Sequence, residues 1–266
     1  MIRNRADRRL KIVLSVTAVL VLLAAYTLVA HLQHLKNPDD TTIPTWRQLA
    51  DGVIASCEVN HRSGERWVLV DSLATGMRLF LGLSCGVAGA VLLGLLMGCF
   101  EKIEAFFAPP MSLLAKVPPT AALAVFFVMV GTDTEMYIAM IAFGVLPTLA
   151  QAVHLGVKDV PRELIYKAYT LGASHCEVVW NVILRQTLPK VIDAVRLQIG
   201  PAMVFLIAAE MVCGDVGFGY RIRLQSRLLN MSVVYPYLAL LAAFGFGVDF
   251  SLRRLQRLLC PWYTGR

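Results

Sequence analysis

Long apolar runs separated by short polar segments constrain the fold of this chain more than any other feature. A helix needs about 20 predominantly apolar residues to cross the hydrocarbon core of a bilayer. Five runs reach or approach this length, and a sixth, which ends at Val130, is interrupted by prolines; the five cover residues 12–32, 72–99, 136–154, 191–211 and 233–252. We therefore expect an all-α polytopic membrane protein with six transmembrane helices.

The composition supports this class and excludes others. Hydrophobic residues make up 57% of the chain and charged residues only 16%, with a mean hydropathy of +0.64, which is typical of membrane proteins. The net charge of +7 would permit nucleic-acid binding. However, the basic residues cluster beside the apolar runs, where topology and anionic lipid head groups account for them. Because no nucleic-acid module is recognisable either, we expect no nucleic acid among the partners.

No motif for catalysis or metal binding stands out. The six cysteines form no C-x-x-C pair and have no zinc-ligand spacing, so we expect buried, inert side chains. Phosphate-loop and G-x-S-x-G motifs are absent from the sequence. We expect no catalytic residue, no metal and no cofactor. Because the chain lacks a motif to hold ATP, any ATP-driven function needs a motor from another polypeptide.

The positive charges predict the orientation of the chain. With six spans, 15 Lys and Arg fall in the inner segments and seven in the outer ones, which places both termini in the cytoplasm. The first run is long for the apolar part of a cleaved signal peptide, and its small-residue cleavage pattern is poor. Arg221, Arg223 and Arg227 lie in an outer segment against the trend, and we hypothesise that they meet an acidic surface of an external partner.

Prolines interrupt the third apolar segment. Each of the pairs 109–110 and 118–119 removes backbone donors, so we expect the helix to break at both pairs. Irregular backbone at membrane depth is tolerated only where it is buried in protein or lines a water-filled cavity. Lys116, Val117 and Pro118 are therefore candidates for the inner part of a transport pathway. An interfacial helix at 110–116, with Lys116 reaching lipid head groups, explains the pattern equally well.

Few charged side chains lie within the apolar runs. Arg78 is expected to reach the membrane interface or to pair with Asp71. Glu210 is either a gate or pathway residue or an acid satisfied by neighbours such as Arg221. Small residues also repeat at four-residue spacing in the second run, which predicts close helix packing at Gly82, Gly86, Gly94 and Gly98.

A polar stretch at residues 159–189 separates two of the apolar runs and has the pattern of helix, glycine turn and helix. Pro161 suits a first helical turn, and Gly172 is expected to end that helix. Ser174 and Glu177 form a capping-box pattern that begins the second helix, and Pro189 is expected to mark its exit. We expect an apolar face on the first helix made of Leu164, Ile165, Ala168 and Leu171. Two short amphipathic helices at a membrane surface are a docking element.

These residues carry a family resemblance. Residues 166–174, followed by Leu188 and Pro189, resemble the "EAA" loop in the membrane subunits of binding-protein-dependent ABC importers. The family's Glu-Ala-Ala falls on Tyr166, Lys167 and Ala168, so only the alanine matches. Residues 208–211 and 217–220 are similar to the nitrate, sulfonate, taurine and bicarbonate branch of that family.

The resemblance implies an architecture and partners. It implies an N-terminal helix and external segment at 1–70, a type I importer transmembrane domain at 71–262 and a cytoplasmic coupling loop at 156–190. It further implies separate ATP-binding subunits, an extracytoplasmic solute-binding protein and a second permease copy, identical or similar, in a bacterial-type inner membrane. The solute would be a small anion such as nitrate, bicarbonate, taurine or a sulfonate. The expected ATPase-docking residues are Glu163, Tyr166, Lys167, Ala168, Leu171 and Gly172.

Two other classes are weaker interpretations of the same residues. An ion-coupled secondary transporter needs ionisable groups within the membrane and inverted repeats. Apart from Lys116, Glu210 and charges at the ends, the apolar runs are almost free of charge. An intramembrane enzyme would need a cluster of His, Asp, Glu or Ser within the runs, and no such cluster is evident in the sequence.

Overall fold

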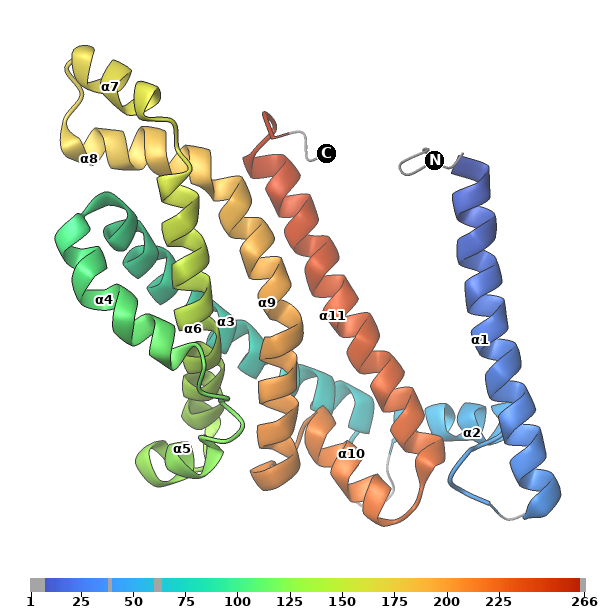
Figure 1. Cartoon of the computed structure of the whole chain (residues 1–266). Coiled ribbons are helices and arrows are strands. Elements are labelled where there is room, and N and C mark those ends of the chain that lie inside the picture. Colours follow the sequence, from blue (N-terminus) through green and yellow to red (C-terminus); the bar gives the residue numbers. More distant parts are fainter. Residues whose placement is uncertain (1–7, 38–39, 60–63, 264–266) are drawn as a thin grey trace. The chain divides into compact units, whose positions relative to one another are not determined.

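The computed structural model describes residues 8–37, 40–59 and 64–263 and is built of helices (Figure 1). One isolated antiparallel bridge joins Val59 and Arg66. The expected all-α class is therefore confirmed. The basic residues before Arg8 lie outside the described residues. The elements are α1 (Arg8–Lys36), α2 (Trp46–Cys57), α3 (Trp67–Cys99), α4 (Glu101–Leu114), α5 (Leu123–Val130), α6 (Thr134–Lys158), α7 (Arg162–Thr170), α8 (His175–Glu177), the π-helix η1 (Val178–Ile183), α9 (Leu184–Cys213), α10 (Phe218–Arg227) and α11 (Met231–Leu259).

Among the described residues, five helical stretches are long and apolar enough to cross a membrane. They are Ile12–Lys36, Trp67–Cys99, Thr134–Lys158, His175–Cys213 and Met231–Leu259, and each contains one of the five continuous runs. The interrupted run does not form a sixth helix of this length. It forms the shorter α4 and α5, joined by turns at residues 115–122, because Pro118 and Pro119 break the helix as expected.

Other prolines do not end their helices, and here the sequence-based expectation is wrong. Pro109 and Pro110 lie inside α4, and Pro189 lies inside α9 instead of marking an exit. A proline removes one hydrogen bond and crowds one carbonyl. The Pro189 ring is buried in α9, whereas Pro109 and Pro110 are exposed in α4, which packs against α6. The second helix of the polar stretch therefore continues without interruption into the next span.

Helices α3 and α6 pack closely along the predicted stripe of glycines. A Cβ atom at Gly94 would lie 2.6 Å from the Ala150 carbonyl oxygen, and one at Gly98 would lie 2.5 Å from the Val157 Cβ atom. These contacts leave no room for a side chain. The small-residue pattern is therefore confirmed as a packing feature that sets the distance between the two helices.

The hydrophobic core is centred on α6. Half of the apolar 18-residue core segment of this helix is buried, a larger share than in the other four spans. Met136, Ile141 and Leu149 are fully covered, and Ala202 and Leu206 of α9 pack into the same core. Helices α6 and α9 thus form the central pair of this part of the chain.

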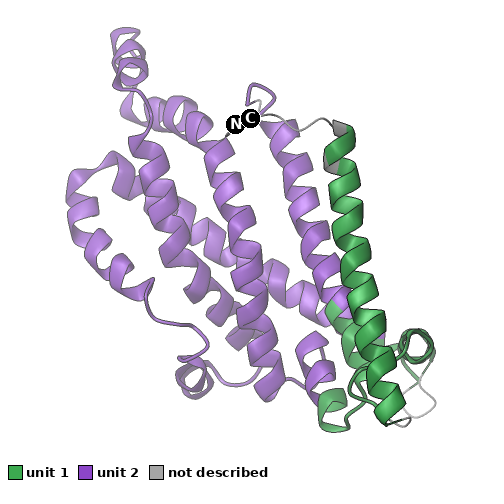
Figure 2. Cartoon of the chain, turned by 45° about the vertical axis from the view of Figure 1, so that its right-hand side comes forward, with its two compact units in different colours: residues 1–67, 224–238 green, residues 68–223, 239–266 purple. Residues whose placement is uncertain are grey.

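The chain divides into two compact units (Figure 2). Unit 1 comprises residues 1–67 and 224–238, and unit 2 comprises residues 68–223 and 239–266. In unit 1 the Tyr26 ring packs edge-on against Trp46 at 5.2 Å, and the Tyr26 hydroxyl donates to the Pro44 carbonyl. A capping box between Thr45 and Gln48 begins α2. The candidate functional site lies entirely within unit 2.

The cysteines differ from the expectation that they are buried. Only Cys260 is buried, whereas Cys57, Cys85 and Cys176 are exposed. Apolar faces of a membrane protein contact lipid, so an apolar sequence environment does not by itself bury a side chain in protein.

Candidate functional site

The 156–190 loop, which runs from the end of α6 to the start of α9, folds as a helix, a glycine turn and a second helix. Helix α7 packs on η1, and Figure 1 shows it lying at the end of α6 and α9. Gly172 follows α7 with a φ of 83°, a left-handed conformation that favours glycine. The Ser174 hydroxyl accepts from the Glu177 amide, and the Glu177 carboxylate accepts from the Ser174 amide. The predicted turn and capping box are both confirmed.

The faces of α7 are rotated from the prediction. Ile165 and Ala168 pack against the core, although Ala168 was also expected among the ATPase-docking residues, whereas Leu164 and Leu171 are 37% and 87% exposed. The four residues therefore do not form one inward face, and the expectation that Leu164 packs inward is wrong. Leu171, an expected docking residue, lies on the outer side. The outer surface of the loop carries Glu163, Tyr166, Lys167, Leu171 and Gly172. This surface combines large apolar side chains with charge, which is typical of a contact surface.

Side-chain contacts hold the loop in place. The Tyr169 hydroxyl lies 2.8 Å from His175 Nδ1, which joins α7 to α8. Lys190 Nζ lies 2.8 Å from Asp159 Oδ2, which joins α9 to the end of α6. These contacts hold α7 in a fixed position, with its outer face exposed.

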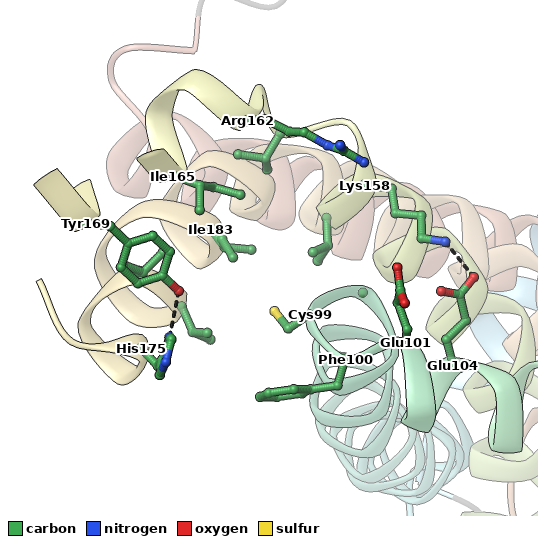
Figure 3. Close-up of a pocket in the computed structure, with 15 residues that line it drawn as sticks. Cys99, Phe100, Glu101, Glu104, Lys158, Arg162, Ile165, Tyr169, His175 and Ile183 are labelled. Carbon is green, nitrogen blue, oxygen red and sulfur yellow. Dashed lines mark hydrogen bonds and ion pairs between the residues drawn. The ribbon is translucent and has the colours of Figure 1, made fainter. Parts of the chain in front are cut away.

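A cavity of about 780 Å³ lies beneath the loop (Figure 3). Figure 3 shows Tyr169 and His175 on one side of it and Glu104 with Lys158 on the other. The hydrogen bond from Lys158, with a further contribution from His154, holds the pKa of Glu104 below its ordinary value. Glu104 therefore keeps its negative charge, and α4 stays joined to α6, at neutral pH.

The break between α4 and α5 borders a second cavity, of about 420 Å³. The three residues predicted for the inner part of the pathway, Lys116, Val117 and Pro118, line it. The middle parts of α6 and α9 supply the other walls, including the polar residues Thr148 and Gln198. The complete lining is Leu114, Ala115, Lys116, Val117, Pro118, Pro119, Phe143, Gly144, Thr148, Gln198, Pro201 and Phe205.

Glu210, the remaining pathway candidate, lies apart from this cavity in a buried polar cluster. Its carboxylate is fully covered and accepts hydrogen bonds from Thr75 Oγ1, Arg78 Nη1 and the Gly219 amide at 2.9–3.0 Å. A buried carboxylate needs such partners, because water does not reach it. These contacts favour the interpretation of Glu210 as an acid satisfied by its neighbours.

The same cluster holds the turn between α9 and α10 against α3. Asp71 accepts from Arg221 Nε and from the Gly217 amide, both at 2.9 Å. Arg78 also donates to the Val216 carbonyl at 2.8 Å. The sequence offered Asp71 as one possible partner of Arg78, and Arg221 as one possible neighbour of Glu210. The structure instead pairs Arg78 with Glu210 and Arg221 with Asp71, because the turn brings Arg221 over the start of α3.

Two further arginines of unit 2, Arg196 and Arg223, have partners within the chain. Arg196 Nε lies 2.8 Å from Asp249 and its Nη1 lies 2.7 Å from Asp193. Arg223 donates to the Val212 carbonyl at the end of α9. Arg221 and Arg223 thus have partners within the chain, and the hypothesis that they meet an acidic surface of an external partner together with Arg227 stays a prediction.

Sequence reasoning missed three polar contributors to these sites. Thr75, Thr148 and Gln198 are single polar residues inside apolar runs, and nothing in their local pattern distinguishes them. Thr75 lies on the same helix face as Arg78, and this spacing is a signal that could have indicated it. Thr148 and Gln198 are indicated only by their position in the cavity with Lys116.

An all-α polytopic chain with an exposed helix–turn–helix loop and a cavity at a broken helix has the features of a membrane transport subunit. Residues 90–263 match the family described as "Binding-protein-dependent transport system inner membrane component", and the chain belongs to this family. It is a permease subunit of an ABC importer. This finding removes the support for an ion-coupled secondary transporter.

Curated relatives place the chain in the taurine and sulfonate branch. It is 31% identical to the taurine transport system permease protein TauC of Escherichia coli, over 70% of this chain and 68% of that protein. It is 29% identical to the putative aliphatic sulfonates transport permease protein SsuC of E. coli, over 80% of each chain. The predicted resemblance to this branch is confirmed.

Solved structures share the fold. The inward-facing MetNI methionine ABC transporter superposes with a TM-score of 0.63, 20% identity and coverage of 71% of this chain and 94% of that one.

Proposed function

We propose that this subunit forms the translocation pathway for a small solute and couples to separate ATP-binding subunits through the 156–190 loop. The observation that carries the proposal is the outer face of α7, where Tyr166 is 62% and Leu171 87% exposed next to Glu163 and Lys167. Exposed apolar side chains on a loop that is held in place by internal contacts suit binding in a groove of another protein. Gly172 supplies the turn that presents them.

The coupling is mechanical, with no chemistry on the permease itself. Closure of two ATP-binding subunits moves the loops that they hold, and the spans shift between inward-open and outward-open arrangements. The continuous helical stretch His175–Cys213 supports this mechanism, because it joins the loop to the buried cluster around Glu210. Movement at one end of this helix is thus transmitted to the other.

The remaining assembly follows the family. The complete importer has two permease copies, most simply a homodimer, two ATP-binding subunits and an extracytoplasmic solute-binding protein. It lies in a bacterial-type inner membrane with both permease termini in the cytoplasm. Residues 71–262 act as the transmembrane domain, and residues 1–70 add a helix and an external segment.

The solute is a small molecule with an anionic group, as the relatives' names indicate: taurine, whose sulfonate is accompanied by an ammonium group, or another sulfonate, with nitrate and bicarbonate as the other members of the branch. The cavity lined by Lys116 and Pro118 is the part of the pathway that contacts it. Glu210 acts at the end of a moving helix instead of contacting solute.

Gly172→Asp tests the proposed loop function. A side chain strains the left-handed turn and adds charge to the contact face, so we expect solute-stimulated ATPase activity to fall at least about tenfold while the chain stays in the membrane. The matched control is Gly131→Asp, since Gly131 also has a positive φ and open space around it. Both variants are measured with the co-purified complex in proteoliposomes. Full coupling in Gly172→Asp contradicts the assignment.

A further inference from the structure

The cavity between α4, α6 and α9 carries a positive charge that its own lining does not balance. Lys116 is exposed and forms no ion pair with a carboxylate of the residues that the structure describes. The residues that line the cavity include no Asp or Glu. The cavity therefore has a positive potential, which attracts anions.

Five other cations of unit 2 lie within ion-pair distance of a carboxylate. The pairs are Arg78–Glu210, Arg196–Asp249, Arg221–Asp71, Lys158–Glu104 and Lys190–Asp159. Charges at membrane depth are expensive and normally paired, so an unbalanced lysine on a cavity wall indicates a place for a charged ligand. Thr148 and Gln198 lie near the middle of α6 and α9, which places the cavity about halfway along these spans.

The other groups on the wall suit an organic oxyanion. The lysine ammonium supplies three donors and the Gln198 amide supplies two. The Thr148 hydroxyl donates to the Val145 carbonyl, so it offers only lone pairs to the cavity and supplies no donor to an oxyanion. Phe143 and Phe205 add an apolar surface for a short carbon chain. A volume of about 420 Å³ lies within the usual range for small-molecule sites.

We propose that this cavity is a solute-binding site for a small organic oxyanion of the sulfonate type. Lys116 binds the charged oxygens, Gln198 orients them, and the phenylalanines cover the carbon part. This inference rests on the proposed function, in which the chain forms the pathway. A lipid phosphate presents the same oxyanion chemistry, so the experiment distinguishes a solute from a lipid.

Gly144 keeps the site compact. A Cβ atom there would lie 2.4 Å from the Phe205 ring and 2.9 Å from Pro119. Only glycine lets these two walls approach α6 so closely. The size of the bound anion is therefore set at Gly144 and its charge at Lys116.

The test measures the charge preference of the cavity by cysteine labelling. Val117→Cys is introduced into the chain with its six native cysteines replaced by alanine, in phosphatidylcholine nanodiscs. Labelling rates are compared for an anionic reagent, methanethiosulfonate ethylsulfonate, and its cationic trimethylammonium counterpart. Because a unit charge a few ångströms away changes local ion concentrations, Lys116→Gln should lower the anion-to-cation rate ratio by on the order of tenfold. Lys190→Gln, which removes a paired lysine outside the cavity, should leave the ratio within about twofold.

Further measurements separate the outcomes. Protection of the introduced cysteine by ethanesulfonate in both phosphatidylcholine and phosphatidylglycerol supports a solute site. If the preference for the anionic reagent disappears in phosphatidylglycerol and ethanesulfonate does not protect the cysteine, Lys116 binds lipid phosphate and the proposal is overturned. An unchanged anion-to-cation labelling ratio in Lys116→Gln also overturns it. If Val117→Cys does not fold, Ala115→Cys is the second reporter. Protection by ethanesulfonate in a complex that shows no ATP-driven uptake would reject the proposed function and leave the site standing.

Discussion

At the scale of single residues, partner choice in the buried cluster is the feature that sequence could not predict. Arg78, Asp71, Glu210 and Arg221 were all recognisable as charges near the ends of apolar runs, yet the pairs that form, Arg78 with Glu210 and Arg221 with Asp71, are not the pairings that the sequence suggested. Pairing depends on the turn after α9, where Gly217 has a φ of 120° and its amide bonds Asp71. A turn of that geometry decides which arginine reaches which acid, and local patterns do not encode it.

The cluster leads to a prediction about stability. Removing one partner of a buried pair leaves an uncompensated charge, so Arg78→Met or Glu210→Met alone should cost about 3–5 kcal/mol of folding free energy. The double variant should cost clearly less than the sum of the two. Thermal unfolding of the purified chain in detergent measures the three variants.

The exposed pair Lys190–Asp159 is the control, because both of its side chains are about half exposed or more. The two single variants of this pair and their double variant should give a coupling free energy of about 0–1 kcal/mol. Additive effects in the Arg78 and Glu210 variants would show that the two residues do not stabilise each other.

At the scale of elements, the continuous apolar runs and their small-residue stripes predicted most of the architecture. Hydrophobic length is a local property, and so is the glycine repeat that lets α3 contact α6. The effect of each proline on its helix was less predictable, because Pro118 lies at a helix break whereas Pro189 lies inside a continuous helix. Burial of the individual rings does not separate the two cases, because Pro109 and Pro110 are exposed within α4 whereas Pro119 is buried at the break.

Substitution of Gly94 tests the packing of α3 on α6. A leucine there would collide with the Ala150 carbonyl and Val153, so we expect a loss of at least about 1–3 kcal/mol and a lower unfolding temperature in detergent. Gly247→Leu is matched to it, because Gly247 is also helical but a Cβ atom added there would have nothing within 4 Å. Equal unfolding temperatures for the two variants would refute the close contact.

At the scale of the whole molecule, the permease is organised around one long element that begins in the exposed loop. The stretch His175–Cys213 starts beneath α7, passes the cavity at Gln198 and ends in the buried cluster at Glu210. The sequence predicted the loop, its turn and its capping box, because these depend on local residues. It could not predict the rotation of α7, which depends on contact with η1, or the continuity through Pro189.

The most direct test of the central claim is site-specific cross-linking on α7 in native membranes. A photoreactive amino acid is placed at Leu171 or, as the control on the opposite face of the helix, at Ile165. We predict an adduct with an ATP-binding subunit from position 171 and little or none from position 165. Adducts of position 171 with an extracytoplasmic protein, or equal capture from both positions, would contradict the account.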